Sequence, residues 1–178
     1  MGYTIVVPGR PSRWMRPAQR ITKDGRVVRF TDPDAEREKR AIRHEVAMAF
    51  RGIRPFTGPV LLRVIAIFAI PPSWPKALRQ AASEGRVAHV ADPDLSQLIK
   101  QAEDAMIGIA YVDDNQIVGY PNCAKRYGFP ERTEITIQRL AQAPDEVTPG
   151  QKRLEKRIAA EGWDAVLSPA ARKPSKMK

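Results

Sequence analysis

The sequence predicts an α+β fold, a small mixed β-sheet with helices packed on it. Three observations support this: an apolar, β-branched segment at 60–70, alternating segments before and after it, and several stretches whose apolar residues recur at helical spacing. The chain has 178 residues, enough for one domain with its own core.

The N-terminal part supplies a strand, a hairpin and a helix. Residues 3–7 alternate and end at a Pro-Gly pair, which is typical of a strand. Residues 19–30 carry Asp-Gly between two β-prone arms, a hairpin signal. Thr31 or Asp32 can cap a helix over 34–50.

The central part alternates between helices and a buried strand. The run 60–70 is interpreted as a strand deep in the sheet, and 73–85 as a short helix that Ser73 caps. Residues 95–107 form an amphipathic helix with a broad apolar stripe, which ends at Gly108.

Two further strands and a C-terminal extension complete the prediction. Residues 116–120 and 133–140 alternate as strands, and the loop between them carries Lys125, Arg126 and Tyr127. Later in the chain, 148–163 could form an amphipathic helix, and 168–178 is a basic, weakly hydrophobic tail that we expect to be disordered. The expected division is an ordered domain at 1–142 and a basic extension at 143–178.

The charge balance favours an anionic partner. Thirty Lys and Arg against twenty Asp and Glu give a formal net charge of +10. Such an excess is typical of proteins that bind nucleic acid, although many soluble proteins are merely basic.

No segment predicts a membrane span or an export signal. The longest apolar run contains Arg63, and the N-terminus has no basic region followed by an apolar core. A lone Cys123 cannot form an internal disulfide, which favours a reducing compartment. We therefore expect a cytoplasmic protein with no membrane partner.

The loop after the first strand is a candidate DNA contact. It carries Arg10, Arg13 and Arg16 with Trp14 among them. Positive charges with an interleaved aromatic residue suit a phosphate backbone with stacked bases. A solvated loop is the alternative.

Carboxylates gather between residues 92 and 114, although the protein is basic. This interval holds six acids against one base, Lys100. The acids are Asp92, Asp94, Glu103, Asp104, Asp113 and Asp114. Structural explanations exist for some of them: Asp94-x-x-Gln97 fits a capping box, and "VDDNQ" fits an ordinary turn.

A metal site is the functional explanation of the same residues. Ser96, Lys100 and Asp104 lie four residues apart along one edge of the predicted helix. If the turn after this helix brings Asp114 back to Asp94, the two carboxylates repel unless a cation neutralises them. Mg²⁺ takes one or two carboxylates and completes its shell with water and substrate phosphate. Lys100 would steady a phosphate oxygen, which predicts a metal-dependent nuclease.

The segments "PDLSQLIK", "EDAM" and "VDDNQIV" resemble the motifs of the RusA-type Holliday-junction resolvases, roughly D-L-D-N-L-x-K, D-A-L and D-D-x-Q-V-V in that order. The opening "VPGRPSRWMRP", the segment "PPSWPKALRQAASEGRVAH" and "KRYG" resemble phage-borne relatives, so the resemblance covers about residues 3–140. It implies a RusA-like homodimer that uses Mg²⁺, with Mn²⁺ as a possible substitute. Its expected activity is endodeoxyribonuclease cleavage of four-way junctions or branched DNA in recombination, repair or phage DNA processing.

Site residues carry over from the resemblance by position. Asp94 matches the first Asp of D-L-D, Lys100 the motif Lys, Asp104 the Asp of D-A-L, and Asp113 and Asp114 the D-D pair. The expected catalytic residues are Asp94, Asp114 and Lys100. The expected metal-site residues are Asp94, Asp114, Asp113, Ser96, Asp92 and Asp104. The expected DNA-binding residues are Arg10, Arg13, Arg16, Lys125 and Arg126.

One departure from the motif concerns the metal site. Ser96 stands where the family has the second Asp of D-L-D, and a neutral hydroxyl is a weaker Mg²⁺ ligand than a carboxylate. Asp92 or Asp104 could compensate, or cleavage is weakened while junction binding survives. A non-catalytic branched-DNA-binding protein is therefore the alternative function. An RNA-binding protein ranks lower, since the chain lacks an RNP-type strand or a GXXG clamp.

Overall fold

The computed structural model describes residues 2–15, 18–30, 32–143 and 146–168. These residues form four α-helices and a mixed, open five-stranded sheet, which confirms the predicted α+β fold. The strands of this sheet, in spatial order, are β1 (Gly2–Pro8), β7 (Arg132–Arg139), β4 (Val60–Phe68), and then β5 (Ile117–Gly119) and β6 (Ala124–Tyr127).

Strand β4 is the centre of the sheet because it has partners along both sides. It pairs antiparallel with β7 along one side. On its other side, β5 pairs parallel with its first residues and β6 pairs parallel with its last residues, from Ile65 to Phe68. Val60, Leu62 and Val64 are fully buried, as the apolar composition of this segment predicts.

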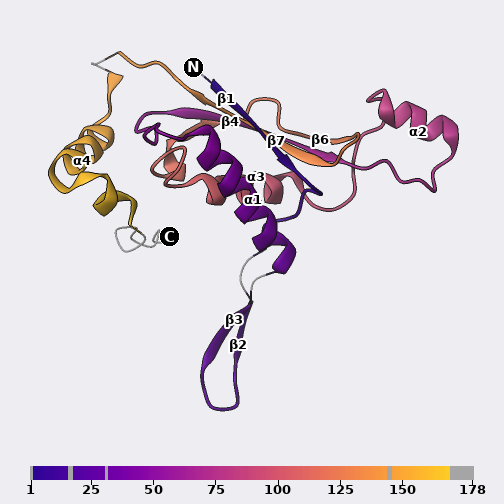
Figure 1. The fold of residues 1–178 in the computed structure, drawn as a ribbon, viewed down its shortest axis with the longest axis horizontal. Coiled ribbons are helices and arrows are strands. Elements are labelled where there is room, and N and C mark those ends of the chain that lie inside the picture. Colours follow the sequence, from indigo (N-terminus) through magenta and orange to yellow (C-terminus); the bar gives the residue numbers. More distant parts are fainter. Residues whose placement is uncertain (1, 16–17, 31, 144–145, 169–178) are drawn as a thin grey trace.

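Helices α1 (Pro33–Ala49) and α3 (Leu95–Met106) pack on each other over one face of the sheet (Figure 1). The carboxylate of Asp32 caps α1 by accepting from the backbone N–H groups of Asp34 and Ala35, at 2.8 and 3.2 Å. The apolar stripe of α3 joins the core with Ala102, Ala105 and Met106 fully buried. On the opposite face, Val6 of β1 is half exposed, so this part of the sheet faces solvent.

The predicted hairpin is present and projects away from the sheet (Figure 1). Strands β2 (Ala18–Ile21) and β3 (Val27–Phe30) pair antiparallel, with Ile21 opposite Val27. Gly25 in the connecting turn has φ +79°, a left-handed conformation that glycine adopts without strain.

Helix α2 is shorter than the sequence predicts. It spans Lys76–Ser83, its N-cap is Pro75, and it has no side-chain cap, so the prediction of Ser73 as a cap is wrong. The chain before it forms a turn in which the N–H of Trp74 donates to the carbonyl of Pro71 at 3.2 Å. This turn delays the helix start by three residues beyond Ser73.

Strand β6 occupies a segment that the sequence predicts to be a loop, and this prediction is wrong. Lys125, Arg126 and Tyr127 lie in this strand, paired with Ala66, Ile67 and Phe68. A four-residue strand with two cations shows almost no hydrophobic alternation, so its sequence carries little signal. Its backbone pairing with β4 determines the structure there.

Thr148 is the N-cap of helix α4 (Pro149–Leu167) and forms a capping box with Gln151. Gly162 interrupts it with φ +79°, and the helix continues past the predicted end at 163. Arg54 lies 5.6 Å over the ring of Trp163. The predicted tail from 169 lies outside the described residues.

Among the described residues, no helix has the length and apolar character needed to cross a membrane.

Candidate active site

Lys100 is the centre of an acidic cluster formed by α3 and the segment after it. Its Nζ lies 2.9 Å from Asp104 Oδ1, 3.1 Å from Asp114 Oδ2 and 3.4 Å from Glu103 Oε2. Asp104 and Glu103 follow Lys100 on the same helix, whereas Asp114 begins the short 3₁₀ helix η1 (Asp114–Gln116). The structure therefore brings together three of the predicted site residues, Lys100, Asp104 and Asp114, and adds Glu103.

A tight chain reversal places Asp114 beside the middle of α3. Gly108 adopts φ +80° and its N–H donates to the carbonyl of Tyr111 at 2.7 Å. Tyr111 is fully buried, and its hydroxyl donates to the backbone carbonyl of Glu103 at 3.0 Å. Phe56 fixes the same turn, since its N–H donates to Ala110 at 2.9 Å. The turn therefore brings Asp114 to Lys100, which lies about 7.5 Å along the helix axis from the first helical residue, Leu95, at a rise of about 1.5 Å per residue.

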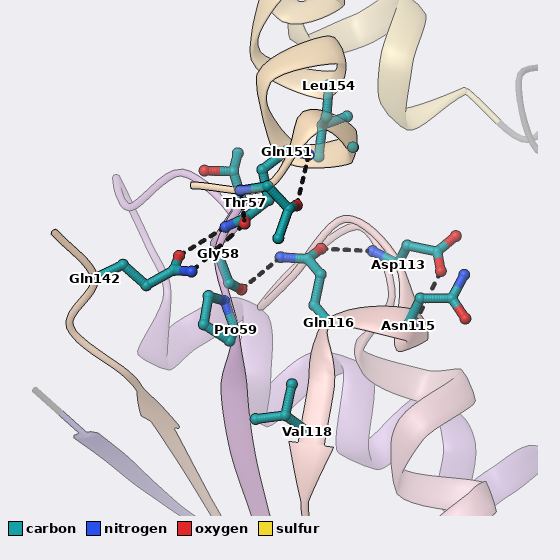
Figure 2. Close-up of a pocket in the computed structure, with 12 residues that line it drawn as sticks. Thr57, Gly58, Pro59, Asp113, Asn115, Gln116, Val118, Gln142, Gln151 and Leu154 are labelled. Atoms are coloured by element: carbon teal, nitrogen blue, oxygen red, sulfur yellow. Dashed lines mark hydrogen bonds between the residues drawn. The ribbon is translucent and has the colours of Figure 1, made fainter. Parts of the chain in front are cut away.

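The two adjacent aspartates of the D-D pair have different contacts. Asp113 caps η1: its Oδ1 accepts from the N–H of Asn115 at 3.0 Å, and the side chain of Gln116 accepts from the N–H of Asp113 at 2.9 Å (Figure 2). Gln116 also donates to the carbonyls of Phe56 and Gly58, at 2.7 and 2.9 Å. Asp113 thus stabilises the turn, which is the structural explanation the sequence offered, while Asp114 contacts Lys100.

The charge of Lys100 is stabilised by its acidic partners. Burial lowers the pKa of Lys100, but the hydrogen bonds and charges of Asp104 and Asp114 raise it more, so the net pKa lies above its usual value. The lysine therefore stays protonated at neutral pH and compensates the neighbouring carboxylates.

Three residues of this cluster were not among the predicted site residues. Glu103 is only 7% exposed and accepts a hydrogen bond from the hydroxyl of Tyr120. Trp14 Nε1 donates to Asp104 Oδ2 at 2.9 Å. Burial, followed by the hydrogen bond to Glu103, raises the pKa of Tyr120 to about 12. The acid count pointed to Glu103, and Trp14 is predicted only as the aromatic residue of the basic loop. The contacts of Trp14 with Asp104 and of Tyr120 with Glu103 join distant segments and have no local sequence signal.

The start of α3 carries the other predicted acidic residues. Asp94 is the N-cap residue, yet its carboxylate makes no capping hydrogen bond, so the capping-box interpretation is wrong. Asp92, Asp94 and Ser96 are exposed, and no hydrogen bond or ion pair joins their side chains to another described residue. Across the described part of the chain, no group of three or more His, Cys, Asp or Glu residues is arranged to hold a metal ion.

Among the predicted DNA-binding residues, Lys125 makes structural hydrogen bonds, and the described arginines are exposed. Lys125 Nζ donates to the carbonyls of Ala91 and Pro93, at 2.7 and 2.9 Å, and so fixes the loop that leads into Asp94. Arg126 is exposed. Arg10 and Arg13 are exposed and line an open pocket of about 300 Å³ whose wall includes Asp92 and Pro93. The predicted Arg16 lies outside the described residues.

A hollow of about 380 Å³ lies on the other side of η1, between the start of β4 and the start of α4 (Figure 2). Its wall includes Val118 and Leu154, and the amides of Gln142 and Gln151 bond to each other at 2.7 Å. Asp113 is the only charged residue in the described lining. The hollow adds no further carboxylate to the cluster around Lys100.

Comparison with protein families gives one match. The model of the family "Endodeoxyribonuclease RusA" matches residues 8–138, which include the basic loop, α3 and the D-D pair and exclude α4. A search of curated proteins finds no match. Because the family model covers most of the 178 residues, this chain belongs to the RusA endodeoxyribonuclease family.

Proposed function

We propose that the chain is a Mg²⁺-dependent, structure-specific endodeoxyribonuclease that resolves four-way junctions or related branched DNA in recombination, repair or phage DNA processing. Family membership supports the endodeoxyribonuclease activity. The observation that carries the assignment of the site is the meeting of Asp104 and Asp114 at Lys100, 2.9 and 3.1 Å from its Nζ, in a protein of net charge +10.

Asp94, Asp104 and Asp114 are the carboxylates that would hold the metal. Carboxylate oxygens are the donors that Mg²⁺ and Mn²⁺ prefer, and Asp104 and Asp114 already share one cation, the ammonium of Lys100. By their chemistry these donors suit a hard divalent ion, although the described residues do not form a ready-made group of three ligands. When bound, such an ion polarises a phosphoryl oxygen and activates water. Asp113 and Ser96 stay weaker candidates, since Asp113 caps η1 and Ser96 has no charge.

The chain's own side chains perform the remaining tasks. Lys100, kept protonated by its neighbours, neutralises a phosphate oxygen near the cleaved bond. Asp94 is exposed and directly follows Asp92 and Pro93, which line a pocket together with Arg10 and Arg13 of the basic loop, and DNA would approach there. Arg10, Arg13 and Arg126 bind phosphates, and Lys125 acts through the loop whose carbonyls it holds.

A homodimer suits this substrate. A four-way junction offers two equivalent strands, and a two-fold protein presents one site to each. We further propose that residues 1–142 are the nuclease domain and 143–178 a basic extension, consistent with the family match at 8–138. The lone Cys123 supports a cytoplasmic location.

A branched-DNA-binding protein with weakened or no cleavage is the second candidate. Ser96 favours it, because one carboxylate of the family motif is missing. The arrangement at α3 favours it as well, since the described residues include no ready cluster of three metal-binding side chains.

Cleavage of a synthetic four-way junction tests the proposal. The wild-type protein should nick the junction symmetrically with Mg²⁺ or Mn²⁺ and should not nick it in EDTA. Asp94→Asn and Asp114→Asn should abolish nicking while binding persists, and Asp164→Asn, an exposed aspartate on α4, serves as the matched control. Junction binding without nicking across both metals would favour the second candidate. Full cutting by both variants would remove these residues from the mechanism.

A further inference from the structure

The turn between β6 and β7 exposes an aromatic side chain. Phe129 is 89% exposed, more than almost every other large apolar residue among those described. Phenylalanine normally buries most of its surface, because exposure of its ring to water is unfavourable. A ring so displayed on an ordered turn suggests a partner that covers it.

The backbone on both sides of Phe129 is held firmly. Gly128 N–H donates to the carbonyl of Phe68, the last residue of β4, at 2.9 Å. A Cβ at Gly128 would lie 2.9 Å from Cγ2 of Ile67, so the turn lies directly against β4. Glu131 ties the other side: its carbonyl accepts from Gly9 at 3.1 Å and its carboxylate accepts from Ala69 at 3.2 Å. The exposure of Phe129 is therefore built into a braced turn and does not arise from a loose loop.

The surroundings of this turn are basic. Arg10 follows Gly9, which is bonded to the turn, and Arg126 lies exposed near the end of β6. The neighbouring acid, Glu131, already accepts a hydrogen bond from the backbone. An aromatic ring beside arginines suits a nucleobase with its attached phosphates better than an apolar protein surface.

The turn lies at the same end of the fold as the start of α3. Lys125 of β6 bonds to the carbonyls of Ala91 and Pro93, directly before Asp94. Figure 1 shows β6 at the end of the sheet from which α2 projects. Strand β6 therefore links this turn to the segment that leads into Asp94.

We propose that Phe129 stacks on a nucleobase exposed at the branch point and so positions branched DNA against the candidate active site. This inference rests on the proposed function, because it requires branched DNA as the ligand. Every base has a face on which a ring can stack, so the contact selects open base steps over regular duplex without selecting a sequence.

Fluorescence of 2-aminopurine tests the contact directly. The full chain is titrated onto a four-way junction carrying 2-aminopurine at the branch point, with Ca²⁺ replacing Mg²⁺ to prevent cutting. Wild-type protein and Phe129→Trp should change the fluorescence strongly. Phe129→Ala and Phe129→Leu should lose most of that change and bind about tenfold more weakly. Ile21→Ala, which removes another exposed apolar side chain (71%) on the distant hairpin, is the control and should behave as wild type.

Each other outcome overturns the inference. Unchanged fluorescence and affinity in Phe129→Ala would show that the ring contacts no base. A changed sedimentation coefficient of Phe129→Ala without DNA, with the fluorescence response intact, would assign the ring to a contact between protein copies. If wild-type protein binds no branched DNA, the proposed function fails and this inference with it. If wild-type protein binds and cuts while Phe129→Ala does the same, the inference alone fails.

Discussion

The middle and the start of α3 use their polar side chains in opposite ways. In the middle, Lys100 contacts three carboxylates, and Asp104 also accepts a hydrogen bond from Trp14. At the start, Asp94 and Ser96 are exposed, and their side chains form no hydrogen bond or ion pair with another described residue. Ion pairs within the cluster stabilise the fold, whereas a carboxylate without a protein partner is available to bind ligands from solvent. The difference indicates that the middle of the motif holds Asp114 in place, while its start leaves side chains exposed to solvent, where we propose that the substrate binds.

The largest expected effect is a loss of DNA cleavage in variants of Asp94 and Asp114. The unfolding temperatures of the same variants distinguish the start of α3 from its middle. Asp94→Asn and Asp114→Asn should each lower junction cleavage by about a hundredfold or more, since each removes a carboxylate that we propose as a ligand of the metal ion. Only Asp114→Asn should also lower the thermal unfolding temperature, because Lys100 loses a partner at 3.1 Å. Cleavage time courses and calorimetry on both variants measure this. Equal unfolding temperatures for Asp114→Asn and wild type would contradict the division.

Replacement of Lys100 should destabilise the protein. Lys100→Met leaves the buried Glu103 and its acidic neighbours without their cation. Because the lysine side chain is 39% exposed, solvent screens part of the interaction, and we expect a loss of about 1 kcal/mol in the free energy of unfolding. Urea denaturation measures it, with Lys76→Met at the exposed start of α2 as the control. A variant as stable as this control would show that the cluster contributes nothing to folding.

Tyr120→Phe should change how stability depends on alkaline pH. The folded protein raises the pKa of Tyr120 to about 12 from its ordinary value of 10.0, so between these values the unfolded state has lost its proton while the folded state retains it. Folding stability therefore falls as pH rises from about 10 to about 12. Tyr120→Phe removes this contribution, and its stability should decline less steeply across that window in denaturation series. If the free energy of unfolding of Tyr120→Phe changes with pH in parallel with that of the wild type, the result would argue against the hydrogen bond to Glu103.

Restoration of the family carboxylate should have the smallest effect. Ser96→Asp places a charge on the exposed start of α3, and cleavage should rise a few-fold if the site lacks only this ligand. Initial cleavage rates measure it, and Ser96→Asn, which is polar but uncharged, is the control. An unchanged or lower rate would indicate that Asp92 or Asp104 already fills the position.

The sequence predicts elements with strong local patterns and misses contacts that depend on distant segments. The apolar stripe of 95–107 and the β-branched run at 60–70 correspond to α3 and β4 within one or two residues. The return of Asp114 to the middle of α3 depends on the buried Tyr111 and on Phe56, whose positions only the folded core determines. The contact of Trp14 with Asp104 likewise joins residues ninety positions apart.

Local patterns also misled where tertiary structure overrides them. Asp94-x-x-Gln97 matches a capping box, yet the Asp94 carboxylate caps nothing. The predicted DNA contact of Lys125 stays a prediction, and the structure adds a role that its charge does not indicate: its ammonium donates to two carbonyls of the loop before Asp94. Charge and spacing identify which residues are available for chemistry, but the fold decides which of them are occupied by structural contacts.

Binding of Mn²⁺ to the free protein, followed by calorimetry and by the electron paramagnetic resonance of unbound Mn²⁺, tests the central claim most directly. In the proposed site, Asp94 at the start of α3 and Asp114 beside its middle hold one cation together. Wild-type protein should therefore bind Mn²⁺, while Asp94→Asn and Asp114→Asn should each bind it at least about tenfold more weakly and Asp164→Asn should match wild type. Wild-type affinity in Asp94→Asn would contradict the account.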